Sequence, residues 1–232
     1  MDLSRREFLT CTAGAMLVQL PFPRPATLEQ PRLARIIQIN RQCSIPESVA
    51  GYHSALAGRS LSHVVIYPAI LQMPLSHAQT IRSWLTFGAT VVVESGAGFA
   101  ADLRFRQHRR SLRAGLDVDV SAPVDLRIPH CGARRAPYID YTWPYPAKVR
   151  DFSRVVPLGD QPGEIIAWAD GLPVALRRQV GRGTLIVLGS PLGPALWAGD
   201  MQARSWLLDA LAGVVPRCGY SRIPTRTPIV TA

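Results

Sequence analysis

The chain has 232 residues, a formal net charge of +10 and 47% hydrophobic residues. About 200 residues follow an unusual N-terminal segment, a length that fits one domain with a substantial core rather than several domains. The basic excess favours an acidic partner, an anionic membrane surface or anionic glycans, although a merely solvated basic surface would carry the same charge.

The first 21 residues have the pattern of an export signal. Arg5 and Arg6 lie within a Ser-Arg-Arg-Glu-Phe-Leu run, and an apolar stretch from Leu9 to Leu20 follows. This pattern resembles a bacterial twin-arginine (Tat) signal peptide, which the export machinery reads through the arginine pair. The resemblance implies the Tat machinery as a partner, folding before export, and a periplasmic or otherwise exported protein.

The fate of this signal is open. Its apolar stretch has about 12 residues, fewer than the roughly 20 that span a bilayer. Ala13-Gly14-Ala15 has the small-x-small form of a cleavage site but lies inside the apolar stretch, so an uncleaved anchor in the inner membrane is the alternative. We expect a Pro-rich linker at 22–32, a folded domain at 33–217 and a tail at 218–232, with membrane contact only through an uncleaved signal or a basic patch.

Residues 35–93 alternate between buried strands and amphipathic helices. A helix is predicted from Pro46 to about Ala57, and a second from Ser76, where Ser-His-Ala-Gln has the spacing of a capping box, to Gly88. Strands without polar alternation, separated by helices, imply a parallel sheet covered on both faces. Short apolar runs place these strands at 35–39, 63–67 and 89–93.

The remainder adds a basic helix and antiparallel strands. Phe99 to Leu112 is predicted to be helical, and the Pro-, Gly- and Tyr-rich stretch 129–146 to be an irregular loop. Asp200 is expected to cap a last helix that ends before Pro216. Strands are predicted at 118–120 and 124–128, and an antiparallel meander at 164–168, 173–180 and 184–188.

Three segments together resemble the class I glutamine-amidotransferase-like domains. They are a strand ending in Pro68 with the helix after it (64–68 and 75–79), the helix end and strand at 87–93, and the late strand pair at 173–189. The resemblance implies an α/β, flavodoxin-like fold: a mainly parallel sheet with helices on both faces and an antiparallel C-terminal strand extension.

The catalytic residues of that family are missing from this sequence. Catalytic members place a cysteine in a Gly-x-Cys-x-Gly turn and follow it with a His-x-Glu pair, because a thiolate needs an exposed turn and an imidazole beside it. Here Val93 occupies the position of the first glycine, Ser95 the position of the cysteine, and His-x-Glu does not occur. We therefore expect the non-catalytic branch of the family, which occurs beside carbohydrate-active enzymes and in envelope proteins.

Candidate ligand-binding residues follow the predicted parallel strands, because open parallel sheets bind ligands at the carboxyl ends of their strands. Ser95 with the neighbouring glycines could form a backbone nest for an anion or a sugar, act as a nucleophile beside Glu94, or lie in a plain glycine-rich turn. A nucleophilic serine would need a histidine within reach, and His130 is the one we could place there. The candidates at this rim are Asn40, Arg41, Glu94, Ser95, Gly96, Gly98 and Ser190.

Two other segments are candidate contact surfaces. The aromatic loop 138–145 offers Tyr141 and Trp143 for sugar stacking or protein recognition and Asp140 as a third weak catalytic candidate, or it folds its rings back onto the sheet. The basic helix is either a solvated face or a site for an acidic partner or a phospholipid surface. Its partner-binding candidates are Arg104, Arg106, Arg109, Arg110 and Arg113.

The sequence predicts neither a metal nor a cofactor. It contains no CxxC pair, its five histidines are scattered, and Cys43, Cys131 and Cys218 allow at most one disulfide. The leading hypothesis is an exported, non-catalytic binding or assembly module of the cell envelope, whose partner is an envelope protein or an anionic glycan or lipid surface and not nucleic acid. The alternative is an envelope hydrolase acting on a glycan or amide through the Glu94/Ser95 rim.

Overall fold

The computed structural model describes residues 34–39, 43–59, 61–126, 138–150 and 154–214. The expected export signal, linker and tail lie outside these residues, as do Asn40, Arg41, His130, Cys131 and Cys218. Among the helices described, none has the length and apolar character needed to cross a membrane.

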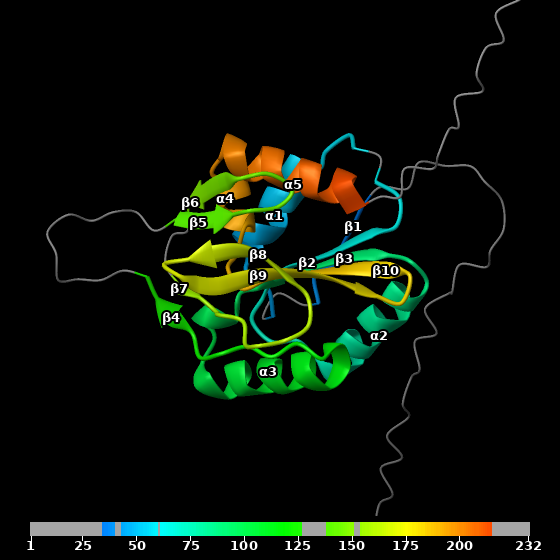
Figure 1. Cartoon of the computed structure of the whole chain (residues 1–232), viewed down its shortest axis with the longest axis vertical. Coiled ribbons are helices and arrows are strands. Elements are labelled where there is room, and N and C mark those ends of the chain that lie inside the picture. Colours follow the sequence, from blue (N-terminus) through cyan, green and yellow to red (C-terminus); the bar gives the residue numbers. More distant parts are fainter. Residues whose placement is uncertain (1–33, 40–42, 60, 127–137, 151–153, 215–232) are drawn as a thin grey trace, which may run out of the picture. The chain divides into compact units, whose positions relative to one another are not determined.

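An eight-stranded mixed sheet forms the centre of the domain (Figure 1). Its order is β1-β2-β3-β10-β9-β8-β5-β6, and the first four strands are parallel, which confirms the predicted neighbours. The other four continue the sheet in antiparallel pairs, so the predicted antiparallel extension is also confirmed. The bounds are β1 Arg35–Ile36, β2 Val64–Ile70, β3 Thr90–Ser95, β5 Tyr138–Tyr141, β6 Ala147–Arg150, β8 Glu164–Ala169, β9 Leu172–Val180 and β10 Gly183–Leu188. A separate pair consists of β4 (Val124–Asp125) and β7 (Arg154–Val155).

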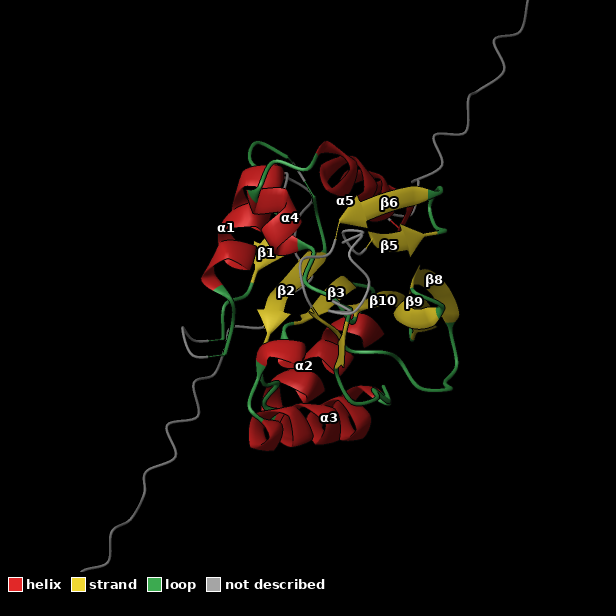
Figure 2. Ribbon diagram, turned by 90° about the vertical axis from the view of Figure 1, so that its left-hand side faces the viewer, coloured by secondary structure: helices red, strands yellow, loops and turns green. Residues whose placement is uncertain are grey.

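Helices cover both faces of the parallel strands (Figure 2). Every residue of β2, β3 and β10 is buried, so alternate side chains of these strands enter two separate cores. Ile66, Val92 and Ile186 belong to the core with α1 and α5, whereas Val65, Val91 and Leu185 belong to the core with α2 and α3. The helices are α1 (Pro46–Ala55), α2 (Leu75–Thr86), η1 (Ala97–Phe99, one 3-10 turn), α3 (Asp102–Leu116), α4 (Gly193–Trp197) and α5 (Met201–Val214).

Two predicted helices have different ends in the structure, and one predicted cap is confirmed. α2 begins directly after Pro74 and no side chain caps it, so Ser76 lies inside the first turn instead of forming a capping box. α3 begins three residues later than predicted and continues to Leu116, because the chain first makes the short η1 turn. Asp200 does cap α5, since its Oδ1 accepts hydrogen bonds from the backbone N–H groups of Gln202 (2.8 Å) and Ala203 (3.1 Å).

The stretch predicted as an irregular loop instead ends in a β-hairpin, β5–β6. Along β5, Ile139 and Tyr141 are buried while Tyr138 and Asp140 are exposed, which is the alternation of a half-buried strand. Conversely, the strand expected at 118–120 is limited to a single bridge between Val120 and Leu158, and the one expected at 124–128 is described only over the two residues of β4.

Candidate functional site

The carboxyl ends of the parallel strands bring several predicted site residues together. Glu94 on β3 is paired in register with Leu188 on β10, and Ser95 is paired with Ile70 on β2. Ser190 follows β10 by two residues, and Gly96 and Gly98 continue from β3 into η1. All five predicted residues are nonetheless buried, with Glu94 0% and Ser95 2% exposed. They lie under the rim of the sheet and not on an open surface.

The Glu94 side chain connects β3 to the first turns of two helices. Its Oε1 accepts a hydrogen bond from the Ser48 hydroxyl of α1 (2.7 Å) and another from the Gly193 backbone N–H of α4 (2.9 Å). Burial raises the pKa of Glu94 to about 7, and the donors around it, Gly193 first, oppose that rise. The carboxyl group is therefore a titrating interior group that holds the packing of α1 and α4 against the sheet.

A second polar group faces Glu94. Neither Glu94 Oε2 nor the Tyr52 hydroxyl makes a hydrogen bond of ordinary geometry, yet each lies close enough to the other to influence its pKa. Burial, and then the neighbouring Glu94, raises the pKa of Tyr52 well above its usual value. The tyrosine therefore carries a neutral hydroxyl at any physiological pH, and this hydroxyl lies near the Glu94 carboxyl group.

Ser95 lies beside a histidine that the sequence analysis did not single out. Ser95 Oγ is 3.3 Å from His108 Nε2, and the Met73 backbone N–H donates to His108 Nδ1 at 3.1 Å. Because Nδ1 accepts a hydrogen bond from the Met73 backbone N–H, the proton of the neutral ring must be on Nε2, which then donates a hydrogen bond to Ser95. Burial also lowers the pKa of His108 to about 4, so the ring is neutral near pH 7.

This tautomer is the wrong one for activating a serine. A general base must offer Ser95 an unprotonated nitrogen, whereas His108 offers an N–H. Ser95 Oγ also accepts the backbone N–H of Ala97 at 3.3 Å. In this arrangement Ser95 is an acceptor that holds α3 and η1 against the end of β3.

The basic helix α3 presents its arginines outward. Buried His108, Leu112 and Leu116 mark the side that packs on the domain. All five predicted partner-binding arginines are exposed, and Arg109 forms an ion pair with Asp119 at 3.2 Å. Figures 1 and 2 show α3 as the outermost element on its face of the sheet.

The aromatic candidates pack inward rather than forming an exposed surface. Tyr141 is 4% exposed, with its ring 4.0 Å from that of Trp206. Trp143 is half-buried, its carbonyl accepts the Trp206 indole N–H at 2.7 Å, and the Arg177 guanidinium lies 4.3 Å from its ring. These rings fold back onto the sheet, whereas Asp140 stays exposed and pairs with Lys148 at 3.4 Å.

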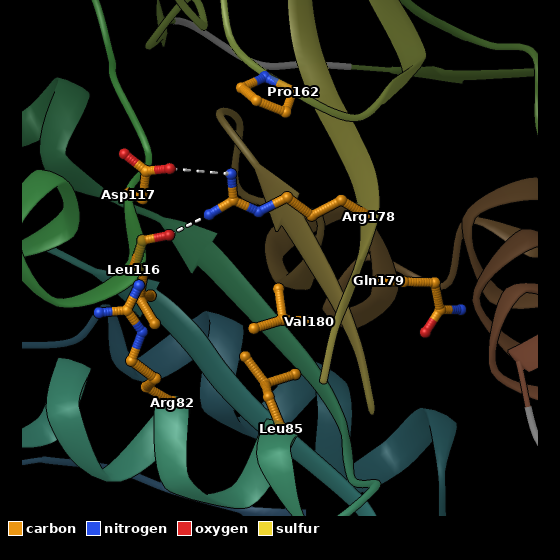
Figure 3. A pocket seen from close by; sticks show the side chains of 8 residues that line it. All are labelled: Arg82, Leu85, Leu116, Asp117, Pro162, Arg178, Gln179 and Val180. Atoms are coloured by element: carbon orange, nitrogen blue, oxygen red, sulfur yellow. Dashed lines mark hydrogen bonds and ion pairs between the residues drawn. The ribbon is translucent and has the colours of Figure 1, made fainter. Parts of the chain in front are cut away.

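A cavity of about 230 Å³ lies near Arg178, Gln179 and Val180 of β9 (Figure 3). Gln179 pairs with Thr184 at the start of β10, whereas Glu94 pairs with Leu188 at its end, so the cavity and Glu94 lie at opposite ends of the strands. Arg178 reaches from β9 to the end of α3, where it donates to the Leu116 carbonyl and lies 3.9 Å from Asp117. Burial is the largest effect on the pKa of Arg178 and lowers it. The Asp117 carboxylate opposes this shift, and the Arg82 guanidinium adds to it. A cation at a helix C-terminus satisfies its last carbonyls, so Arg178 serves the fold there. The lining residues are Arg82, Leu85, Leu116, Asp117, Pro162, Arg178, Gln179 and Val180, none of them a predicted site residue.

The described residues contain no group of three or more His, Cys, Asp or Glu side chains that could hold a metal ion. Within the same residues, Cys43 is a free, partly exposed thiol.

No protein-family model matches the sequence, and no curated protein matches it significantly. The cold-adapted beta-galactosidase from Rahnella sp. R3 aligns with 70% of this chain and 27% of its own, at 12% identity and a TM-score of 0.50. Gan42B, a GH42 beta-galactosidase from G. stearothermophilus, aligns with 71% of this chain and 26% of its own, at 12% identity and a TM-score of 0.48. Cytoplasmic protein STM1381 from Salmonella typhimurium LT2 aligns over 60% of both chains, at 13% identity and a TM-score of 0.45.

At these identities the likeness concerns the fold alone. The chain spans about a quarter of the length of the first glycosidases that it matches, with 25%, 26% and 28% of those chains covered. The chain has an α/β fold with a mixed sheet that is parallel at its start, and this fold resembles the aligned part of the beta-galactosidase from Rahnella sp. R3.

Proposed function

We propose that this chain is an exported, non-catalytic binding or assembly module of the bacterial cell envelope, and that it contacts its partner through α3. The observation that carries the proposal is the outward face of this helix. Among the described residues, no carboxylate pairs with Arg106, Arg110 or Arg113, all of which are exposed. An exposed patch of one charge attracts an anionic partner, here an envelope protein or an anionic glycan or lipid surface.

The polar cluster at the strand ends supports a non-catalytic role. His108 donates a hydrogen bond to Ser95 and so cannot act as its base. Glu94 is enclosed by α1 and α4. The sequence contains neither the cysteine turn nor the His-x-Glu pair of the catalytic amidotransferases. The Arg5–Arg6 signal supports the exported location, and we expect the Tat machinery to be the partner during export.

The second candidate function is an envelope hydrolase that uses Glu94 and Ser95 on a glycan or an amide. One observation favours it: a buried carboxyl group whose pKa is raised to about 7 lies next in sequence to a serine–histidine pair. To act as a base, His108 would have to lose the hydrogen bond from the Met73 N–H and carry its proton on Nδ1 instead of Nε2. The buried site would also have to open to solvent. The binding role needs neither change, and we prefer it.

Capture of the natively exported protein tests the proposal. We expect an affinity-tagged chain recovered from the envelope to bring with it a specific envelope component, identified by mass spectrometry of proteins and lipids. The control replaces Arg5 and Arg6 by lysine, because the export receptor reads the pair as an address. That variant should stay in the cytoplasm without the component. Export of the lysine variant, or recovery of the exported wild type alone, would contradict the proposal.

A further inference from the structure

We infer that the outer face of α3, together with the η1 turn before it, is a peripheral binding site for an anionic lipid bilayer. The inference rests on the proposed function, because it names the partner of the same surface. Two features carry it: a stripe of arginines along α3 and two exposed apolar side chains at the N-terminal end of that stripe.

The arginine stripe runs along one side of the helix. Leu103, Arg106, Arg110 and Arg113 succeed one another at spacings of three and four residues, which places them on the side opposite buried Leu112. The three arginines extend over about 10 Å of helix at 1.5 Å per residue. Arg109 lies at the flank, where Asp119 already neutralises it. The stripe therefore presents three unpaired positive charges to one flat surface.

The apolar side chains complete an amphipathic contact. Leu103 is 61% exposed and Phe99, at the end of η1, is 46% exposed. An interfacial helix that binds lipid combines basic residues, which meet anionic headgroups, with a few large apolar residues that enter the headgroup and acyl boundary. Phe99 ends η1 and Leu103 lies in the first turn of α3, so both exposed side chains lie near the N-terminal end of the arginine stripe.

A bilayer fits this combination better than an acidic protein does. A bilayer offers a continuous sheet of negative charge with hydrocarbon directly beneath it, so the arginines and the two apolar side chains can be satisfied together. A basic surface without exposed apolar side chains would fit an acidic protein or an anionic glycan as well as it fits a bilayer. The exposed Phe99 and Leu103 therefore favour a bilayer over an acidic protein or glycan.

The test is binding of the purified full-length protein to phosphatidylcholine vesicles with and without phosphatidylglycerol. The α3 variant changes Arg106, Arg110 and Arg113 together to Gln. The control variant changes Arg59, Arg182 and Arg204 to Gln, three exposed arginines in other parts of the domain, so both variants lose the same charge and keep the N-terminal segment. We expect the α3 variant to lose about a hundredfold in partitioning to the anionic vesicles, and the control variant only a small fraction of that.

A third variant, Phe99→Ser with Leu103→Ser, should partition to the anionic vesicles about tenfold more weakly than wild type. Its binding should keep the same dependence on salt, because the arginines are unchanged. Circular dichroism melting should show that all three variants fold as the wild type does. Equal loss in the α3 and control variants, or equal binding of the wild type to neutral vesicles, would overturn the inference. If vesicles do not bind while the exported protein still recovers a protein partner, the inference fails and the proposed function stands.

Discussion

Replacing Glu94 with glutamine is expected to remove a contribution to stability that changes between about pH 4.5 and pH 7. The folded protein raises the pKa of Glu94 from 4.5 to about 7, so it binds a proton there that the unfolded chain has released. The stabilising contribution is complete below pH 4.5 and is lost as the pH rises through 7. A shift of this size corresponds to about 3 kcal/mol.

Because His108 also makes the stability of the wild type depend on pH, Glu94→Gln must be compared with wild type at each pH. Burial lowers its pKa from 6.5 to about 4, so its contribution is complete above pH 6.5 and is lost as the pH falls through 4. The two groups oppose each other in wild type, but His108 is common to both proteins and cancels in their difference. Urea unfolding at a series of pH values should show Glu94→Gln gaining about 3 kcal/mol over wild type from pH 4.5 to pH 8.

The control for this series is Glu47→Gln, which changes an exposed glutamate in the first turn of α1. Because the Glu47 side chain is exposed, the unfolding free energy of this variant should stay within about 0.5 kcal/mol of wild type. A Glu94→Gln curve that also runs parallel to wild type would show that the Glu94 carboxyl group is solvated and not enclosed by α1 and α4.

Gly193→Ala is expected to destabilise the domain by about 3 kcal/mol or more, the upper range for overpacking a close contact. A Cβ on Gly193 would overlap both the Cα and the hydroxyl of Ser48, because α1 and α4 touch through their backbones. Separating the helices would also break the hydrogen bonds that Ser48 and Gly193 donate to Glu94. Two sources of loss therefore act at one position.

The matched control is Gly213→Ala in α5. A Cβ there meets only the Trp143 ring at 3.5 Å, an ordinary contact, and alanine is favoured over glycine in a helix by up to about 1 kcal/mol. In thermal melts, the melting temperature of Gly193→Ala should lie below that of wild type and the melting temperature of Gly213→Ala above it. A Gly193→Ala protein as stable as wild type would contradict the close approach of α1 and α4.

The sequence predicted the parallel part of the sheet because its signal is local. β2, β3 and β10 are short runs of buried residues bounded by turn residues, and such runs have few alternative structures. The β5–β6 hairpin was missed because proline and glycine around it favoured a loop, although Tyr138 to Tyr141 alternate with a period of two. The helix starts depended on Pro74 and on η1, which moved the first residue of α2 by one position and that of α3 by three.

The candidate site could be predicted only in part, since the partner of Ser95 comes from another element. His108 lies 13 residues further along, and its position four and eight residues before Leu112 and Leu116 was the signal that it faces inward. Its tautomer depends on the Met73 backbone N–H, which no sequence pattern specifies. The inward packing of Tyr141 and Trp143 depends on Trp206 in α5, again a contact between distant segments.

The most direct test of the central claim is to repeat the capture of the exported protein with the α3 variant beside the control variant. The account predicts that the envelope component recovered with wild type disappears when Arg106, Arg110 and Arg113 are changed to Gln, and remains when Arg59, Arg182 and Arg204 are changed. Higher salt should weaken the wild-type association, because exposed charges are screened over about 8 Å at physiological ionic strength. Full recovery of the component by a folded, exported α3 variant would contradict the claim that this helix is the contact surface.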